Sequence, residues 1–192
     1  MIVLFVLFSC SKDEGGKTVA NGLVQDDTTL DPIEKADVYL TRQEKDCQTC
    51  PVTTQQTTKS GPEGGFNFNF DADANFTYRV SATKTGYFDN LASPQVDLKN
   101  GQGNTPVIKL QPEANLTLQI KNTSPFDAND KIVIAGGGTY KGMTVDTNEV
   151  LIVLGNENNL IKWTVTKNGS SNTYSHFLNC PSFSNTAYTI NY

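Results

Sequence analysis

Four cysteines and one histidine are the residues of this chain whose types and spacing best suit redox or metal chemistry. Cys47 and Cys50 form a C-x-x-C pair, and His176 precedes Cys180 with three residues between them. A thioredoxin-type pair needs a helix N-terminus to lower the pKa of its thiol, and the sequence predicts no helix there. Outside the cytoplasm such a pair would form a local disulfide, and we expect this bond between Cys47 and Cys50.

A zinc site is the alternative for these residues. The Cys47 and Cys50 pair and the His176 and Cys180 pair each have a spacing that zinc accepts. The two pairs fall in different predicted domains, which argues against a shared metal. Cys180 is then left over, either buried as a small hydrophobic side chain or paired with one of the other two cysteines.

Two further motifs resemble known ligand-binding loops only in part. Asp71-x-Asp73-x-Asn75 matches the first half of a calcium loop, but Phe76 and Ala82 stand where that loop needs glycine and glutamate. Lys141, after the glycine run 136–138, is not followed by Ser or Thr as in a phosphate loop. We expect a plain turn at the first motif and a hairpin tip at the second.

No nucleophile and base pair is legible in the sequence. His176 has no G-x-S-x-G elbow to serve, so a structural role is expected for it. Without a complete metal set or an activated nucleophile, the sequence predicts a protein that is not an enzyme, with no metal and no cofactor.

Aromatic side chains are the remaining candidates for a binding surface. Trp163 alternates with Ile161 and Val165, so we expect it to point with them into a core. The tyrosines on polar faces or at strand ends are better candidates for sugar contacts, and these are Tyr39, Tyr87, Tyr140 and Tyr174.

The charge balance excludes one class of partner. Fifteen Lys and Arg residues stand against 20 Asp and Glu, which gives a formal net charge of −5. No basic run exists that could neutralise phosphates, so nucleic-acid binding is not expected.

The N-terminus indicates export and a membrane anchor. The apolar run Ile2 to Phe8 is too short to span a bilayer but fits the apolar part of a signal peptide over residues 1–9. Leu7-Phe8-Ser9-Cys10 resembles the lipobox of bacterial lipoproteins, although no Lys or Arg precedes the run. The resemblance implies lipidation of Cys10 by acyl chains such as palmitate, followed by a flexible tether over residues 10–17.

A second short motif favours the cell surface. Lys12-Asp13-Glu14 resembles the export signal of surface lipoproteins in the Bacteroidetes. The two resemblances together imply a protein of the bacterial outer membrane, lipid-anchored and exposed on the cell.

The rest of the chain alternates between apolar and polar residues with turns between the runs. Phe66, Phe68 and Phe70 alternate with asparagines, and Val80 and Ala82 alternate with polar residues. This period of two predicts half-buried antiparallel strands, and no stretch keeps a helical period. The predicted fold class is all-β, with two antiparallel β-sandwiches.

Residues 18–113 resemble a known family. The ordered pieces Gly22-Leu-Val24, Ala36-Asp-Val38-Tyr-Leu40, Gly65-Phe66-Asn-Phe68, Tyr78-Arg-Val80 and Gly86-Tyr87 resemble the carboxypeptidase regulatory-like domain. The resemblance implies a transthyretin-like sandwich of about seven strands without catalytic residues. The polar insert from Gln43 to Pro62 is longer than the family pattern.

Residues 114–192 predict a second, immunoglobulin-like sandwich. Leu116, Leu118 and Ile120 alternate with polar residues, and Asn168-Gly169 is a strong hairpin signal. No internal repeat of 20–50 residues is evident.

These features together predict a non-catalytic surface lipoprotein that acts as a binding or scaffolding module, with polysaccharide or an envelope protein as partner. The alternative is a structural or adhesin-like envelope subunit that assembles by protein–protein contacts.

Overall fold

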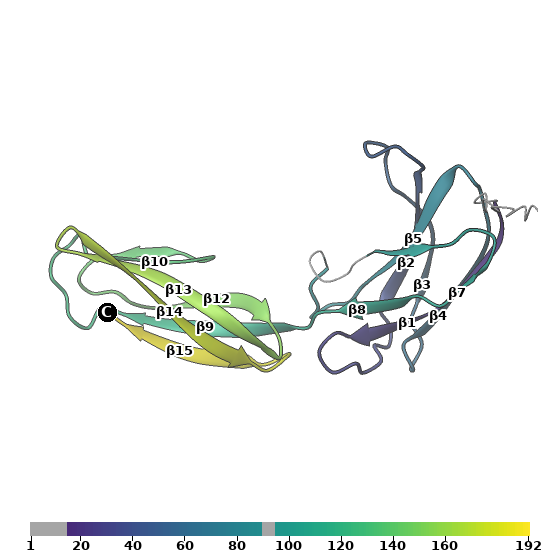
Figure 1. The fold of residues 1–192 in the computed structure, drawn as a ribbon. Coiled ribbons are helices and arrows are strands. Elements are labelled where there is room, and N and C mark those ends of the chain that lie inside the picture. Colours follow the sequence, from purple (N-terminus) through teal and green to yellow (C-terminus); the bar gives the residue numbers. More distant parts are fainter. Residues whose placement is uncertain (1–14, 90–94) are drawn as a thin grey trace, which may run out of the picture. The chain divides into compact units, whose positions relative to one another are not determined.

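The structure is a computed structural model, and it describes residues 15–89 and 95–192. All the regular elements in these ranges are strands, β1 to β15 (Figure 1). The all-β prediction is therefore confirmed. The chain divides into two compact units, the first with β1 to β8 and the second with β9 to β15. The second unit also takes in the short segments Asp27–Thr29 and Thr85–Phe88.

Unit 1 is built from two sheets. One sheet has the order β4-β1-β8, with the short β7 also pairing with β1, and the other has the order β3-β2-β5-β6. The strands are β1 (Gly16–Asp26), β2 (Asp37–Glu44), β3 (Thr53–Lys59), β4 (Gly65–Ala72), β5 (Phe76–Thr83), β6 (Val96–Leu98), β7 (Gly103–Asn104) and β8 (Val107–Leu110).

Alternation along these strands builds the core of unit 1. Val38 and Leu40 of β2 and Val80 of β5 are completely buried, whereas their polar neighbours in sequence are not. Phe66 and Phe68 of β4 face them from the other sheet. Each fully buried side chain of this size stabilises the fold by about 1.5–3 kcal/mol.

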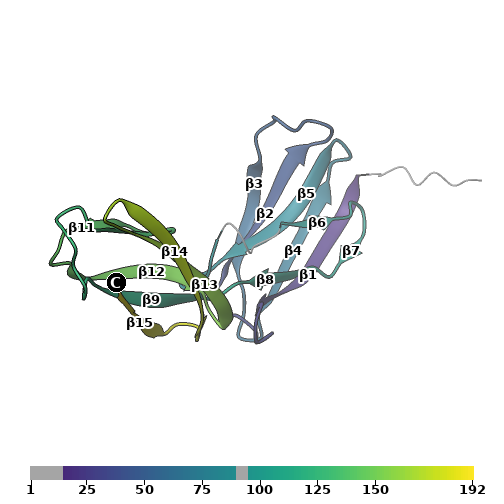
Figure 2. The ribbon, with the colours of Figure 1, turned by 60° about the vertical axis from the view of Figure 1, so that its left-hand side comes forward.

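Unit 2 is built from a sheet of order β12-β9-β15 and a sheet of order β11-β10-β13-β14 (Figures 1 and 2). Its core consists of aliphatic side chains such as Leu116, Leu118, Ile132 and Ile134. The strands are β9 (Glu113–Lys121), β10 (Lys131–Ile134), β11 (Thr139–Lys141), β12 (Asp146–Leu154), β13 (Glu157–Lys167), β14 (Ser170–Cys180) and β15 (Asn185–Asn191).

The two units share one strand order. The short β7 is left out, and the seven other strands of each unit are counted in chain order. Both units then have one sheet of order 4-1-7 and another of order 3-2-5-6. In each unit the first strand is antiparallel to the fourth and parallel to the last. The sequence predicted antiparallel strands throughout, and the parallel pairs are a correction: alternation shows which face is buried but not the direction of the neighbouring strand.

The turns follow the sequence signals. Asn168 and Gly169 join β13 to β14 with φ angles of 48° and 72°, as a two-residue hairpin turn requires. Asp73 Oδ1 accepts hydrogen bonds from the backbone N–H and the side-chain amide of Asn75, so the half-matched calcium motif is an Asx turn between β4 and β5. In the described part of the chain there is no helix of the length and apolarity that crossing a bilayer requires.

Candidate functional site

The outer face of strand β12 carries a row of exposed aliphatic side chains. Val150 and Ile152 are each 61% exposed, and Leu154 is 39% exposed. They point outward because the intervening residues, such as Leu151, pack against the core of unit 2. Three large aliphatic residues in one exposed line are unusual, since burial of each would stabilise the protein.

The same strand is the edge of its sheet. β12 pairs with β9 in continuous register over nine residues, and in the described part of the chain no strand pairs with its other edge. Edge strands are commonly protected by lysine, proline or a β-bulge. The segment 150–154 contains no lysine, proline or β-bulge, but the Asn159 side chain caps its end, accepting from the Leu154 N–H at 3.1 Å and donating to the Leu154 carbonyl oxygen at 2.8 Å.

Strand β4 of unit 1 occupies the equivalent edge, but its outer face is polar. Its outward residues Asn67, Asn69 and Asp71 are polar and exposed, while Phe66 and Phe68 point inward. The aliphatic row is therefore particular to unit 2 and not a property of the strand order.

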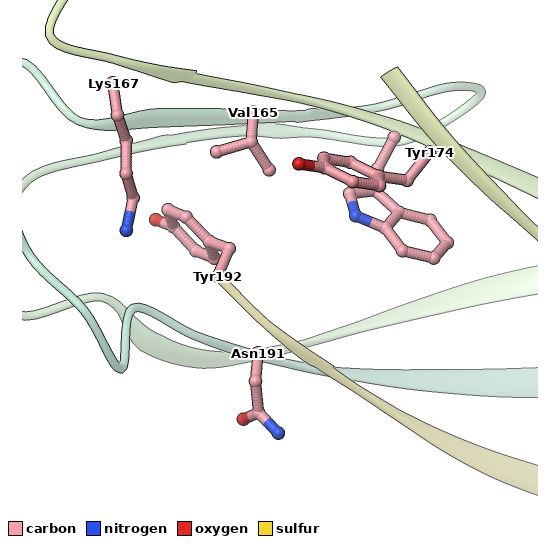
Figure 3. Close-up of a pocket in the computed structure, with 6 residues that line it drawn as sticks. Val165, Lys167, Tyr174, Asn191 and Tyr192 are labelled. Atoms are coloured by element: carbon pink, nitrogen blue, oxygen red, sulfur yellow. The ribbon is translucent and has the colours of Figure 1, made fainter. Parts of the chain in front are cut away.

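A cavity of about 270 Å³ opens between the sheets of unit 2. Figure 3 shows Val165, Tyr174 and Tyr192 around it, with the Lys167 side chain reaching toward the Tyr192 ring. Trp163 also lines the cavity, and its ring stacks on that of Tyr174 with centroids 6.0 Å apart. Trp163 lies on the inward face as predicted, but it is half-buried because the sheets are open here.

A polar cluster lies beside this cavity. The Lys167 Nζ donates a hydrogen bond of 3.0 Å to Asn122 Oδ1, and the Asn122 Nδ2 donates one of 2.9 Å to Asp130 Oδ2. Lys167 Nζ also lies 3.9 Å from Asp130 Oδ2 and 5.0 Å from the centroid of the Tyr192 ring. No sequence motif marks this cluster, because its members are 8 to 45 residues apart.

Asp130 is the acid of the cluster, and its side chain has no exposed area. Its carboxylate also accepts hydrogen bonds from the backbone N–H groups of Phe126 and Asp127. Burial raises the pKa of the Asp130 carboxyl, but the hydrogen bonds from Asn122 and from the two backbone N–H groups, together with the charge of Lys167, outweigh it, so the pKa lies below the usual value.

The two cysteines of the polar insert form a disulfide. Cys47 and Cys50 are bonded in the loop after β2, with Cα atoms 5.4 Å apart. Gln43 donates hydrogen bonds from its side-chain amide to both of their carbonyl oxygens. Cys180 is a free thiol that is completely buried in the core of unit 2.

The zinc alternative finds no support in these positions. His176 stacks on Tyr188 with ring centroids 4.8 Å apart, in unit 2, while Cys47 and Cys50 belong to unit 1. Among residues 15–89 and 95–192, no group of three or more His, Cys, Asp or Glu side chains is placed to hold a metal.

The four predicted tyrosines are not gathered on one face. Tyr39 belongs to unit 1, where its hydroxyl lies 3.4 Å from that of Thr83. Tyr140 and Tyr174 stand on the two opposite edge strands of one sheet, β11 and β14. Tyr87 packs edge-on against Phe183.

Of these tyrosines, Tyr140 is held by its surroundings. Burial and the neighbouring Glu149 carboxylate raise its pKa, and its ring packs against the core of unit 2. Tyr174, which is 49% exposed, is the better placed of the two for contact with a ligand. Cys10, the predicted lipidation site, lies outside the described residues.

Comparisons with known proteins give only distant likenesses. No protein-family model matches the chain, and no curated protein matches it. Among solved structures, the minor pilin GBS52 of Streptococcus agalactiae is 12% identical with a TM-score of 0.43, and the match covers 92% of this chain and 94% of that one. A streptococcal ancillary pilin is 13% identical with a TM-score of 0.43, over 91% and 62% of the two chains.

The Bacillus anthracis TIE protein is 11% identical with a TM-score of 0.40 over 92% of this chain, which spans 34% of that longer chain.

Proposed function

We propose that the chain is a non-catalytic structural subunit of the bacterial cell envelope that assembles through protein–protein contacts. The observation that carries the proposal is the edge of β12, which lacks lysine, proline and a β-bulge over residues 150–154 and carries a row of exposed aliphatic side chains. An edge of this kind is a template for the addition of another strand.

A second copy of the chain fits this edge. In an antiparallel pairing centred on Ile152, each Ile152 faces its counterpart, and Val150 of each copy faces Leu154 of the other. Apolar side chains then meet apolar side chains over the whole segment 150–154. Asp146 and Glu149 fall outside the paired segment, so no like charges are opposed.

The expected association is weak. Each cross-strand pair contributes roughly 0.2–1 kcal/mol, so five residues a copy give a contact that depends on local concentration. Anchoring at a membrane would raise that concentration. We propose that Cys10 supplies the anchor as a lipidated residue, on the outer membrane and facing the cell surface.

Unit 1 lies between the proposed anchor at Cys10 and unit 2 in the sequence. Its two facing sheets agree with the proposed carboxypeptidase regulatory-like fold for residues 18–113, a module without catalytic residues. Its outer face on β4 is polar, so it would stay out of the assembly contact.

Sedimentation velocity of the Ser11–Tyr192 fragment over a concentration series tests the proposal. The fragment should associate as its concentration rises, and the double variant V150T/I152T should remain monomeric. The matched control is N67T/N69T on β4, which should associate like the unchanged fragment. Because the fragment lacks the anchor, the series extends to the highest concentration at which it stays soluble. Monomeric behaviour of the unchanged fragment even there would refute assembly through this edge.

Carbohydrate binding is a second candidate, favoured by the Trp163 and Tyr174 stack at the mouth of the cavity. Aromatic faces of this kind can stack on sugar rings. Affinity electrophoresis of the same fragment through gels containing different polysaccharides tests it. Selective retardation that is lost in Tyr174→Ala would support this candidate, and uniform migration would remove it.

A further inference from the structure

The cluster of Asn122, Asp130 and Lys167 brings together an amine, an amide and a carboxylate from three separate elements. Asn122 follows the last residue of β9, Asp130 precedes the first residue of β10, and Lys167 is the last residue of β13. The pairing of Lys131 with Thr166 sets Asp130 and Lys167 side by side at the end of the sheet. The fold therefore fixes their approach.

We propose that Lys167 and Asn122 become joined by an intramolecular amide bond, with Asp130 carrying the proton between them. The Lys167 amine is the nucleophile, and the side-chain carbonyl carbon of Asn122 is the group it attacks. The 3.0 Å hydrogen bond from Nζ to Asn122 Oδ1 holds the nitrogen beside that carbon. Holding two groups in contact in this way can replace a large part of the entropic barrier of a reaction.

The reaction balances without any further reactant. The Asp130 carboxylate takes a proton from the Lys167 ammonium, whose nitrogen is 3.9 Å from Oδ2, and this frees the amine's electron pair. Because the pKa of Asp130 is lowered, this transfer is unfavourable, so the reaction is slow and is driven forward by the loss of ammonia. The amine adds to Cγ of Asn122, and a new C–N bond forms. Asp130 Oδ2, which is 2.9 Å from Asn122 Nδ2, returns its proton to that nitrogen.

The bond from Cγ to Nδ2 then breaks, and the leaving nitrogen departs with the remaining proton of the attacking amine as an ammonium ion. Asp130 ends as the carboxylate with which it began, so it is a catalytic residue of this step. The protein loses the equivalent of one ammonia, and no group is oxidised or reduced.

The surroundings of the cluster favour this chemistry. Asp130 has no exposed area, and the Lys167 side chain is only 23% exposed. The Tyr192 ring lies next to the Lys167 nitrogen, and Tyr192 Oη is buried without a hydrogen-bond partner. Enclosure of the Asp130 carboxylate strengthens its electrostatic action on the cluster, while the Lys167 amine also faces the open cavity.

The product would tie the two sheets of unit 2 together. Asn122 extends β9, which belongs to the sheet β12-β9-β15, and Lys167 ends β13 of the opposite sheet. A covalent link at this position would keep the sheets from separating under heat or mechanical load. Such a bond suits a subunit whose contacts transmit force, but its existence does not depend on the proposed assembly.

Unit 1 supplies an internal comparison. The pairing of Asp37 with Thr83 matches that of Lys131 with Thr166, so Lys84 corresponds to Lys167. The residue that corresponds to Asp130 is Ala36, which carries no carboxylate. Lys84 Nζ donates to the backbone carbonyls of Glu34 and Lys35, as Lys167 Nζ donates to that of Ser124, but unit 1 has this amine without the buried carboxylate.

Mass spectrometry of the full-length protein after tryptic digestion tests the proposal. The expected result is a linked species in which residues 122–131 are joined to residues 163–192, about 17 Da lighter than the two peptides together. Cleavage after Lys167 should be blocked. Cleavage after Lys84, the control lysine, should be normal, and residues 80–84 should be recovered as a free peptide.

The intact mass of the variant Lys167→Arg, compared with that of the unchanged protein, is the control measurement. The variant keeps the positive charge and the hydrogen-bond donors but lacks a nucleophilic amine. The variant should be about 45 Da heavier than the unchanged protein, where the substitution alone adds about 28 Da. Comparing the two chains cancels any common processing of the N-terminus.

Two results would overturn the proposal. The first is recovery of free peptides 122–131 and 163–167 from the unchanged protein with no linked species. The second is an ammonia loss that persists in Lys167→Arg, because it would then come from ring closure at Asn168-Gly169 instead. The digest of the unchanged protein decides the matter even if the variant fails to fold.

Discussion

The two units of this protein have the same strand order but differ at two equivalent places. The outer face of the edge strand is polar on β4 and aliphatic on β12. The position before the second strand is Ala36 in unit 1 and Asp130 in unit 2. The shared order shows that the strand order itself requires neither feature, so each is particular to unit 2.

The largest expected effect comes from removing the buried carboxylate that unit 1 lacks. The variant Asp130→Ala leaves buried hydrogen-bond donors without an acceptor. It also prevents the proposed amide bond, which by analogy with a disulfide would stabilise unit 2 by about 4 kcal/mol through loop closure. The free energy of unfolding of unit 2 should fall by at least about 3–5 kcal/mol.

Fluorescence of Trp163 during urea denaturation measures this effect, because the chain has one tryptophan and it lies in unit 2. Asp97→Ala is the control, since Asp97 forms an exposed ion pair with Arg79 in unit 1. It should leave the Trp163 transition unchanged. A loss below about 1 kcal/mol in Asp130→Ala would contradict the importance given to the cluster.

A smaller effect is expected from the disulfide, which unit 2 lacks. Replacing Cys47 and Cys50 by serine should destabilise unit 1 by about 2 kcal/mol, as expected for so short a loop, with no change in the Trp163 transition of unit 2. Thiol counting on the denatured, unreduced Ser11–Tyr192 fragment should find one free thiol, that of Cys180. Three free thiols would show that the bond is not formed in the protein.

Acid should destabilise unit 2 through Asp130, a contribution that unit 1 lacks. Because the pKa of Asp130 is lower in the folded protein than in the unfolded chain, its contribution to stability is complete above the ordinary Asp value of about 3.9. That contribution is lost as the pH falls through the lowered pKa. The Trp163 transition should therefore weaken with acid more in the unchanged protein than in Asp130→Asn, and equal pH dependence would contradict the assignment.

The smallest effect on stability, within about 0.5 kcal/mol, is expected from exchanging the two outer faces. In a fragment that carries V150T/I152T, the further substitutions N67V/N69I give β4 an aliphatic row. If exposed aliphatic residues on this edge are sufficient for assembly, the concentration dependence of sedimentation should return. Continued monomeric behaviour would show that β12 has further requirements, such as its own register.

The sequence predicted the strands better than their partners. Alternation around Val38, Phe66 and Leu118 identifies a buried face for each strand, and Asn168-Gly169 identifies a hairpin. Strand direction was not accessible, because a parallel and an antiparallel neighbour require the same alternation. The common strand order of the two units was not accessible either, because no sequence motif is shared between them.

The candidate sites were harder to predict for a related reason. Val150 and Ile152 lie in an apolar run that indicates a buried strand, and only the sheet order shows that one side of it is exposed. Asn122, Asp130 and Lys167 meet through pairing of distant strands, so no local spacing marks them.

The proposed contact between two β12 strands is tested most directly by placing a single cysteine at its centre. Ile152→Cys in the Ser11–Tyr192 fragment should give a disulfide-linked dimer under mild oxidation, because each Ile152 faces its counterpart. Asn69→Cys on β4, which is also exposed and lies on the equivalent edge strand, should give little. Equal dimer yields from the two variants, or none from Ile152→Cys, would contradict assembly through β12.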